Sequence, residues 1–217
     1  MGRADLDRQL TALRDSIETL ATFIDELLDR ALSSVASGDP YDARIAKSRE
    51  DAFDRTCADI EEQAVNMLTL QQPVLASDLR LVVAALVVAQ RLQRVGHNAF
   101  GIAGLAEDLA GLGAPEPPPP ALLALGNDAR GILRDAVHAL ITRDVTAAAQ
   151  VVARDSAIDS AYRAVRDDLL AQLGKAGGTA SDAVHRRLTF WMWVAHKLER
   201  VADHAVVIAR RAEQMGT

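Results

Sequence analysis

Two pairs of carboxylates in the second half of the chain have a spacing that suits a metal site. The members of each pair are four residues apart: Asp155 with Asp159, and Glu199 with Asp203. In a helix, residues at this spacing lie one turn apart on the same face. Like charges so placed destabilise a helix by roughly 0.2 to 0.5 kcal/mol, a cost that a bound cation removes. Oxygen ligands from two helices suit Mg²⁺, Mn²⁺ or iron, and more than one ion can share bridging carboxylates.

The first half of the chain has one such pair and an altered second pair. Glu50 and Asp54 keep the spacing, whereas Gln93 and His97 replace the other two acids. Two negative charges are lost, a glutamine carbonyl is a weak ligand, and histidine favours softer metals such as zinc. We expect this half to bind hard cations weakly, to bind a different ion or to bind none. Hydrogen bonding of Gln93 and His97 at the edge of the core is the favoured interpretation.

The acidic pairs also have an interpretation without metal. Asp159 can pair with Arg163, and Asp203 with Arg200, which would leave solvated faces with ordinary ion pairs. A single acidic pair would favour this interpretation, because acids four apart are common on helices. Two pairs placed alike in a repeat favour metal in the second half.

Other chemistry lacks the residues that it requires. The sequence has no Glu-x-x-His pair, no glycine-rich phosphate loop and no G-x-S-x-G motif, and Cys57 has no histidine nearby in sequence. His196 and His204 are expected to be surface side chains rather than ligands. We therefore predict that the protein is not an enzyme, although a metal-dependent hydrolase with open coordination positions is an alternative.

Composition and charge limit the class of protein further. Of the 217 residues 49% are hydrophobic and 4% aromatic, and 24 Lys and Arg stand against 30 Asp and Glu, for a net charge of -6. Such a chain suits helices and has no field that attracts nucleic acid. The single cysteine and the charged start predict an intracellular protein. The longest apolar run, Leu81 to Ala89, is far shorter than the roughly 20 residues of a membrane span. We expect a soluble, cytoplasmic protein that contacts membrane complexes from outside.

Apolar residues recur at helical spacing along almost the whole chain, which predicts an all-α fold of six long helices. We expect helices over about 4–37, 40–70, 77–109, 121–142, 145–173 and 181–214. They are separated by Ser37 to Pro40, by Gln72-Pro73, by a proline-rich spacer, by Arg143-Asp144 and by a flexible loop over 174–178.

The two halves of the chain match as an internal repeat. Asp39 and Asp144 are 105 residues apart, as are Asp54 and Asp159, and RLQRVGHNAFGIAG aligns with KLERVADHAVVIAR. We therefore predict two tandem, symmetry-related three-helix bundles: a first repeat over 1–111, a linker over 112–120 and a second repeat over 121–217.

Three aromatic residues cluster near the start of the last helix. Phe190, Trp191 and Trp193 cannot all lie on one face, so at least one ring is expected to be exposed or at an interface. Core packing of Trp191 is the default expectation, and a partner contact through Trp193 is an alternative to its burial.

The segments QQPVLASDLR and LERVADHA, together with REDAFD and RDSAID, resemble motifs of the PhoU family of phosphate transport regulatory proteins. The resemblance covers essentially the whole chain and implies two three-helix bundles side by side. It also implies multinuclear metal clusters, often iron and otherwise Mg, Mn or Zn, on the acidic motifs. Here these motifs fall on the following residues: Asp155 with Asp159, Glu199 with Asp203, and Glu50 with Asp54. Gln93 and His97 depart from the family pattern, as in the degenerate first repeat of actinobacterial members.

The same resemblance implies a regulatory function. It implies a non-enzymatic negative regulator of phosphate uptake and phosphate-starvation signalling that couples a high-affinity phosphate ABC transporter, through its ATPase, to a sensor histidine kinase. A homodimer is expected by the same analogy. The alternative is a metal-independent helical scaffold or chaperone-like adaptor whose acidic pairs serve solubility.

Overall fold

The structure is a computed structural model that describes residues 3–70, 76–113, 115–177 and 181–215. Within these residues the chain forms helices and no strands, which confirms the predicted all-α fold. In chain order the helices are α1 (Arg3–Ser37), α2 (Tyr41–Lys47), α3 (Glu50–Leu70), α4 (Ala76–Ala110), α5 (Pro120–Thr142), α6 (Val145–Ala153), α7 (Asp155–Ala176) and α8 (Asp182–Met215). None of the helices in this part of the chain carries an apolar stretch that would cross a bilayer.

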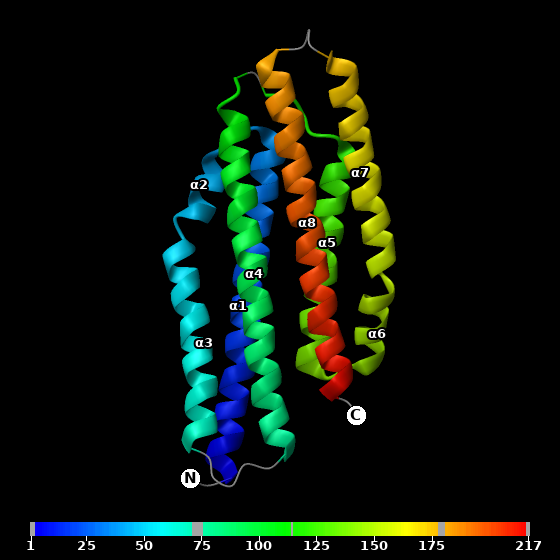
Figure 1. The fold of residues 1–217 in the computed structure, drawn as a ribbon. Coiled ribbons are helices and arrows are strands. Elements are labelled where there is room, and N and C mark those ends of the chain that lie inside the picture. Colours follow the sequence, from blue (N-terminus) through cyan, green and yellow to red (C-terminus); the bar gives the residue numbers. More distant parts are fainter. Residues whose placement is uncertain (1–2, 71–75, 114, 178–180, 216–217) are drawn as a thin grey trace.

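The helices form two bundles that lie side by side (Figure 1). The first consists of α1, α2 with α3, and α4, and the second of α5, α6 with α7, and α8. The long helices α1, α4, α5 and α8 lie in the centre, where α1 contacts α5 and α4 contacts α8. The shorter pairs α2–α3 and α6–α7 cover the two outer sides (Figure 1).

Apolar side chains on one face of each helix form the core. In α1 this face includes Leu13, Ile17, Leu20, Ile24 and Leu27, none of which is more than 3% exposed. Their spacing of three and four residues keeps them on one stripe. Because burying each such side chain contributes roughly 1.5 to 3 kcal/mol, the stripe fixes which face of α1 packs inward.

Each outer helix is interrupted at the equivalent position in the two repeats. The sequence pattern predicted continuous helices here, but Ser48 and Arg154 have ψ angles of -11° and -13° and end α2 and α6. The backbone N–H groups of Arg49 and Arg154 then bond carbonyls three residues back, both at 3.1 Å. Neither interruption contains proline or glycine, so no helix-breaking residue marks it in the sequence.

The arginines at these interruptions contact the first helix of their own repeat. Arg49 Nη1 lies 2.9 Å from Glu26 Oε2, and its guanidinium lies 4.0 Å from the centre of the Phe23 ring. Arg154 pairs with Asp135 in the second repeat. Both outer helices are thus attached to the centre immediately before the acidic pairs begin.

Several helix ends differ slightly from the sequence-based expectation. Helix α5 begins one residue early, with Pro120 in its first turn, and α7 continues to Ala176 before Gly177 adopts a φ of +55°. Helix α6 begins at Val145 as expected, and Asp144 before it caps the helix, since its side chain accepts a hydrogen bond from Ala147 N at 2.9 Å. The predicted break at Gln72-Pro73 and the end of the 174–178 loop lie outside the described residues.

The contact between α1 and α5 holds the bundles together. Arg130 on α5 donates two hydrogen bonds of 3.0 Å to the carboxylate of Asp25 on α1, and it also pairs with Asp29. The helices approach closely at Gly126, where a Cβ atom would lie 2.8 Å from Leu32 Cδ2. A two-pronged ion pair beside a close helix contact fixes the relative orientation of the two bundles.

Candidate metal centre

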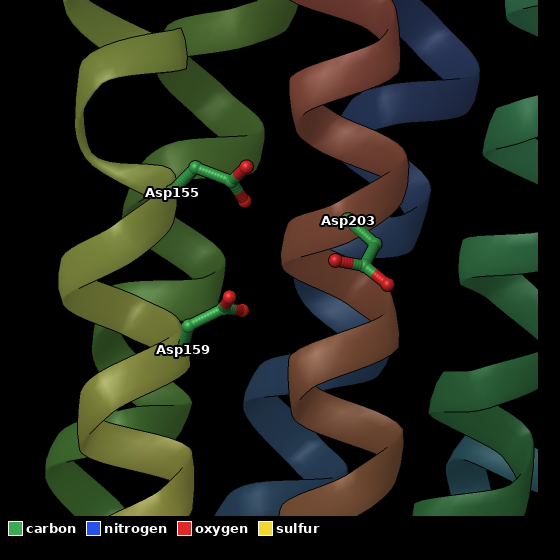
Figure 2. Close-up of side chains that lie close together, drawn as sticks. All are labelled: Asp155, Asp159 and Asp203. Atoms are coloured by element: carbon green, nitrogen blue, oxygen red, sulfur yellow. The ribbon is translucent and has the colours of Figure 1, made fainter.

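Three carboxylates of the second repeat come together between α7 and α8. Asp155 and Asp159 point from α7 towards α8, where Asp203 lies (Figure 2). One potential ligand oxygen from each residue can be chosen so that all three lie within 4.8 Å of one another. The spacing of acids in the sequence predicted that these three residues converge together with Glu199, which is not a member of this group.

The interruption before α7 places Asp155 at the start of a helix. Because α6 ends at Ala153, Asp155 is the first residue of α7. A carboxylate in the first turn interacts favourably with the positive end of the helix dipole. Glu50 occupies the same place at the start of α3, so both repeats begin their second outer segment with an acid.

Glu199 lies one turn before Asp203 on α8, and its charge interacts with those of Asp203, Asp159 and Asp155. Its side chain is 21% exposed, and its Oε2 atom is buried without a hydrogen-bond partner among the described residues. The Nδ1 atom of His196 lies 3.5 Å away and can pair with Oε2 when the ring is protonated. Burial, followed by the charges of Asp203 and Asp159, raises the pKa of Glu199. A buried carboxylate oxygen without a partner is costly, and a cation would satisfy it.

The charge of Asp203 is disfavoured for the same reasons. Burial raises its pKa first, and the charges of Asp155 and Asp159 raise it further, against the opposing effect of Arg200. The ion pairs of the metal-free interpretation do not form in the described ranges, and Arg163 donates to Ser160 Oγ at 3.4 Å. The donor set contains carboxylate oxygens alone, which fits a hard or borderline cation.

The first repeat is arranged differently at the equivalent positions. His97 Nε2 lies 3.3 Å from Asp54 Oδ1, and both side chains are about half exposed. Glu50 is exposed and Gln93 is half-buried. Among the described residues Glu50, Asp54 and His97 do not form a group of three converging ligands. In the first repeat, therefore, a hydrogen bond from His97 occupies one carboxylate oxygen of the site. In the second repeat the equivalent positions hold acids that face one another.

The packing behind the two sites also differs, with a compensating change of side-chain size. In the first repeat Phe53 on α3 packs over Gly96 on α4, where a Cβ atom would lie 2.1 Å from Phe53 Cζ. The equivalent pair in the second repeat is Ile158 with Ala202, both buried. A larger residue opposite glycine and a smaller one opposite alanine keep the outer helix close to α4 or α8 in both repeats.

His204 is buried, and the expectation of a surface side chain was wrong. It is 7% exposed, and burial, with the charges of Arg91, Arg200 and Arg94 behind it, lowers its pKa to about 4. The sequence did carry a signal, since His204 shares the apolar stripe of Val201 and Ala205. His196 is exposed, as expected.

Comparison with known proteins identifies relatives over the whole chain. The family model of the PhoU domain matches residues 17–106 and again 122–212. A protein of Synechocystis sp. named phosphate-specific transport system accessory protein PhoU homolog is 31% identical, with 77% of this chain and 71% of that protein covered. A protein of the same name from Clostridium acetobutylicum is 23% identical, with 94% and 90% covered.

Two solved structures have the same fold. The crystal structure of PhoU from Pseudomonas aeruginosa superimposes with a TM-score of 0.89 at 22% sequence identity and covers 96% of this chain and 97% of that one. The phosphate transport system regulatory protein PhoU from Streptococcus pneumoniae gives a TM-score of 0.84 at 24% identity, covering 98% and 97%.

Proposed function

Because this chain belongs to the PhoU family, we propose that it is an accessory protein of a phosphate-specific transport system and regulates phosphate uptake. The observation that supports this function is the match of both repeats to the family domain, together with relatives that carry this name over most of their length. In the finer form of the proposal, the protein is a non-enzymatic negative regulator that contacts the transporter ATPase and a sensor histidine kinase.

We further propose that the second repeat binds a metal ion, or a cluster of ions, through Asp155, Asp159, Glu199 and Asp203. The convergence of three carboxylates from two helices and the unpartnered buried oxygen of Glu199 support this site. When bound, the cation supplies positive charge that neutralises the acids. We propose a weaker site in the first repeat, because His97 already contacts Asp54 there and occupies one of its carboxylate oxygens. This site consists of Glu50, Asp54, Gln93 and His97.

The chain's own residues determine what such a site does. Asp155 and Asp159 belong to the outer helix α7, whereas Glu199 and Asp203 belong to the central helix α8. Neutralising the four acids together removes the repulsion between the two helices and stiffens their contact. A stiffer outer face gives partners a docking surface of fixed shape, so that binding can depend on the state of the partner.

The test of the function is phosphate uptake in a strain that lacks the gene. Under phosphate-rich growth we expect faster uptake and expression of phosphate-starvation genes, both restored by the wild-type gene. The purified protein should bind the transporter ATPase and the cytoplasmic part of the kinase. Unchanged uptake in the deletion strain would contradict the regulatory function.

The metal site has its own test. Protein purified without a chelating column is analysed for metals by mass spectrometry, as wild type and as Asp155→Asn with Asp203→Asn. We expect bound metal in the wild type and its loss in the double variant, whereas Asp128→Asn, an exposed acid on α5, should keep it. Equal metal content in all three proteins would favour a metal-independent helical scaffold instead.

A further inference from the structure

A groove between the two bundles is positively charged although the protein as a whole is acidic. The groove lies between α4 and α8, and its lining includes Arg94, His97, Leu105, Trp193, Lys197 and Arg200. The whole chain has 24 Lys and Arg against 30 Asp and Glu. The gathering of cations in this groove therefore reflects the placement of residues rather than the composition.

The internal duplication explains how the cations come to face each other. Arg94 and Arg200 occupy equivalent positions, 106 residues apart, and so do Arg91 and Lys197. Because α4 and α8 contact each other, Arg94 on one side and Lys197 and Arg200 on the other line one groove, whereas Arg91 is not among its lining residues. Arg94 and Lys197 form no ion pair with any residue that the structure describes. Like charges gathered in this way are disfavoured unless a negative group lies between them.

The groove has a cationic end and an apolar end. Lys197 lies across Gly101 of α4, where a Cβ atom would be 2.5 Å from its Nζ atom. Since α4 and α8 run in opposite directions (Figure 1), Trp193 and Leu105 lie towards one end of the groove and Arg94 towards the other. The eleven residue steps from Arg94 to Leu105 correspond to about 17 Å along the helix.

Trp193 is held in position although it is exposed. It is 53% exposed, and its ring packs 5.7 Å from the ring of Phe190, which is buried. Tryptophan and arginine are the residue types most enriched among side chains that dominate the binding energy of protein interfaces. A tryptophan fixed beside a row of cations has the composition of such an interface.

We propose that this groove is the docking surface for an acidic segment of a partner protein, with carboxylates on Arg94, Lys197 and Arg200 and an apolar side chain over Trp193. The length of the groove favours a polypeptide, because a small oxyanion at the cationic end would leave Trp193 uncovered. The partner's place in the phosphate transport system rests on the function proposed above.

The first experiment locates the contact with a defined probe. Acrylamide quenching of tryptophan fluorescence reports mainly Trp193, since Trp191 is 5% exposed. The probe is a peptide of about 12 residues, long enough to follow the groove as a helix, rich in glutamate, with a leucine at one end and no tryptophan. We expect it to protect Trp193 at low salt and less at high salt. A matched peptide with lysine in place of glutamate should not protect it.

Variants then separate the groove from the rest of the surface. Arg94→Glu with Lys197→Glu should abolish protection, whereas Arg80→Glu, an exposed cation also on α4, should not. On immobilised transporter ATPase and kinase domain, Trp193→Ala should weaken binding roughly 30-fold, the loss of a buried aromatic anchor. Leu170→Ala, which removes a 46% exposed side chain on α7, should leave binding unchanged. Circular dichroism checks that all variants are folded.

Four results would overturn the proposal. These are no protection by the acidic peptide, protection by inorganic phosphate alone, protection that rises with protein concentration without a probe, and equal binding of the groove variants to the partners. The third result would indicate a second copy of this chain as the occupant. If the wild type binds the acidic peptide in the groove but neither partner, the proposed function fails and the docking surface stands.

Discussion

Replacing Asp203 by asparagine should make the metal-free protein more stable than metal-free wild type. Once metal is added, the variant should be less stable than wild type. The selected oxygens of Asp155, Asp159 and Asp203 lie within 4.8 Å of one another. At that separation each pair of charges repels by about 0.9 kcal/mol in water. Asp203→Asn removes two such pairs, so we expect a gain of about 1 to 2 kcal/mol at low salt, or a Tm higher by about 2 to 8 °C for a chain of this length.

The assay is thermal unfolding in chelator and in Mn²⁺. A ligand at 100 times its Kd stabilises the folded state by about 2.7 kcal/mol, which exceeds the repulsion that wild type carries. The order of stability should therefore invert, with the Asp203→Asn variant the more stable in chelator and wild type the more stable in Mn²⁺. Asp128→Asn should match wild type in both conditions. A lower Tm of Asp203→Asn in chelator, or an equal gain from Mn²⁺ in both proteins, would refute the account of the cluster.

Three further perturbations test other parts of the structure. Because the pKa of Asp203 is raised in the folded state, its charge destabilises the protein at neutral pH. The advantage of Asp203→Asn in chelator should shrink as the pH falls below that raised pKa and vanish below the ordinary value of 3.8. Thermal unfolding across a pH series measures this, and a constant advantage would contradict it. Gly96→Ala places a Cβ atom 2.1 Å from Phe53 Cζ and should cost about 1 to 3 kcal/mol in denaturant unfolding. Gly104→Ala on the same helix meets no atom within 4 Å and should be neutral or stabilising by up to about 1 kcal/mol, so equal losses would contradict the packing argument. Burial, followed by Asp54 and Glu61, raises the pKa of Cys57 to about 12, so a thiol reagent at mildly alkaline pH should label it after unfolding and not before.

The fold could be predicted from the sequence because its determinants are periodic. The stripe from Leu13 to Leu27 predicts both the first helix and its buried face, and the repeat predicts the second bundle from the first. The interruption at Arg154 could not be predicted, because it depends on a tightened turn and on the pairing of Arg154 with Asp135 rather than on a helix-breaking residue. Local propensity carries no information about such tertiary contacts.

The convergence of the acids was predictable for a similar reason, whereas their energetics were not. Spacing of four residues places Asp155 with Asp159 and Glu199 with Asp203 on helix faces, and the structure brings three of the expected group, Asp155, Asp159 and Asp203, together. The sequence does not reveal that Glu199 Oε2 lacks a hydrogen-bond partner in the described part of the chain. That property depends on how neighbouring helices bury the side chain, and this burial can be read only from the three-dimensional structure.

The two repeats have diverged in how they neutralise the same position. In the first repeat, replacement of the second acid by His97 places a ring nitrogen 3.3 Å from Asp54, so the protein itself supplies the hydrogen-bonding group at this site. In the second repeat Asp203 faces Asp155 and Asp159, and in the metal site proposed above a cation would supply the positive charge. With the metal site proposed above, the outer contact of the first bundle would be independent of metal, whereas that of the second would depend on it. A cation would then stiffen one side of the molecule and leave the other unchanged.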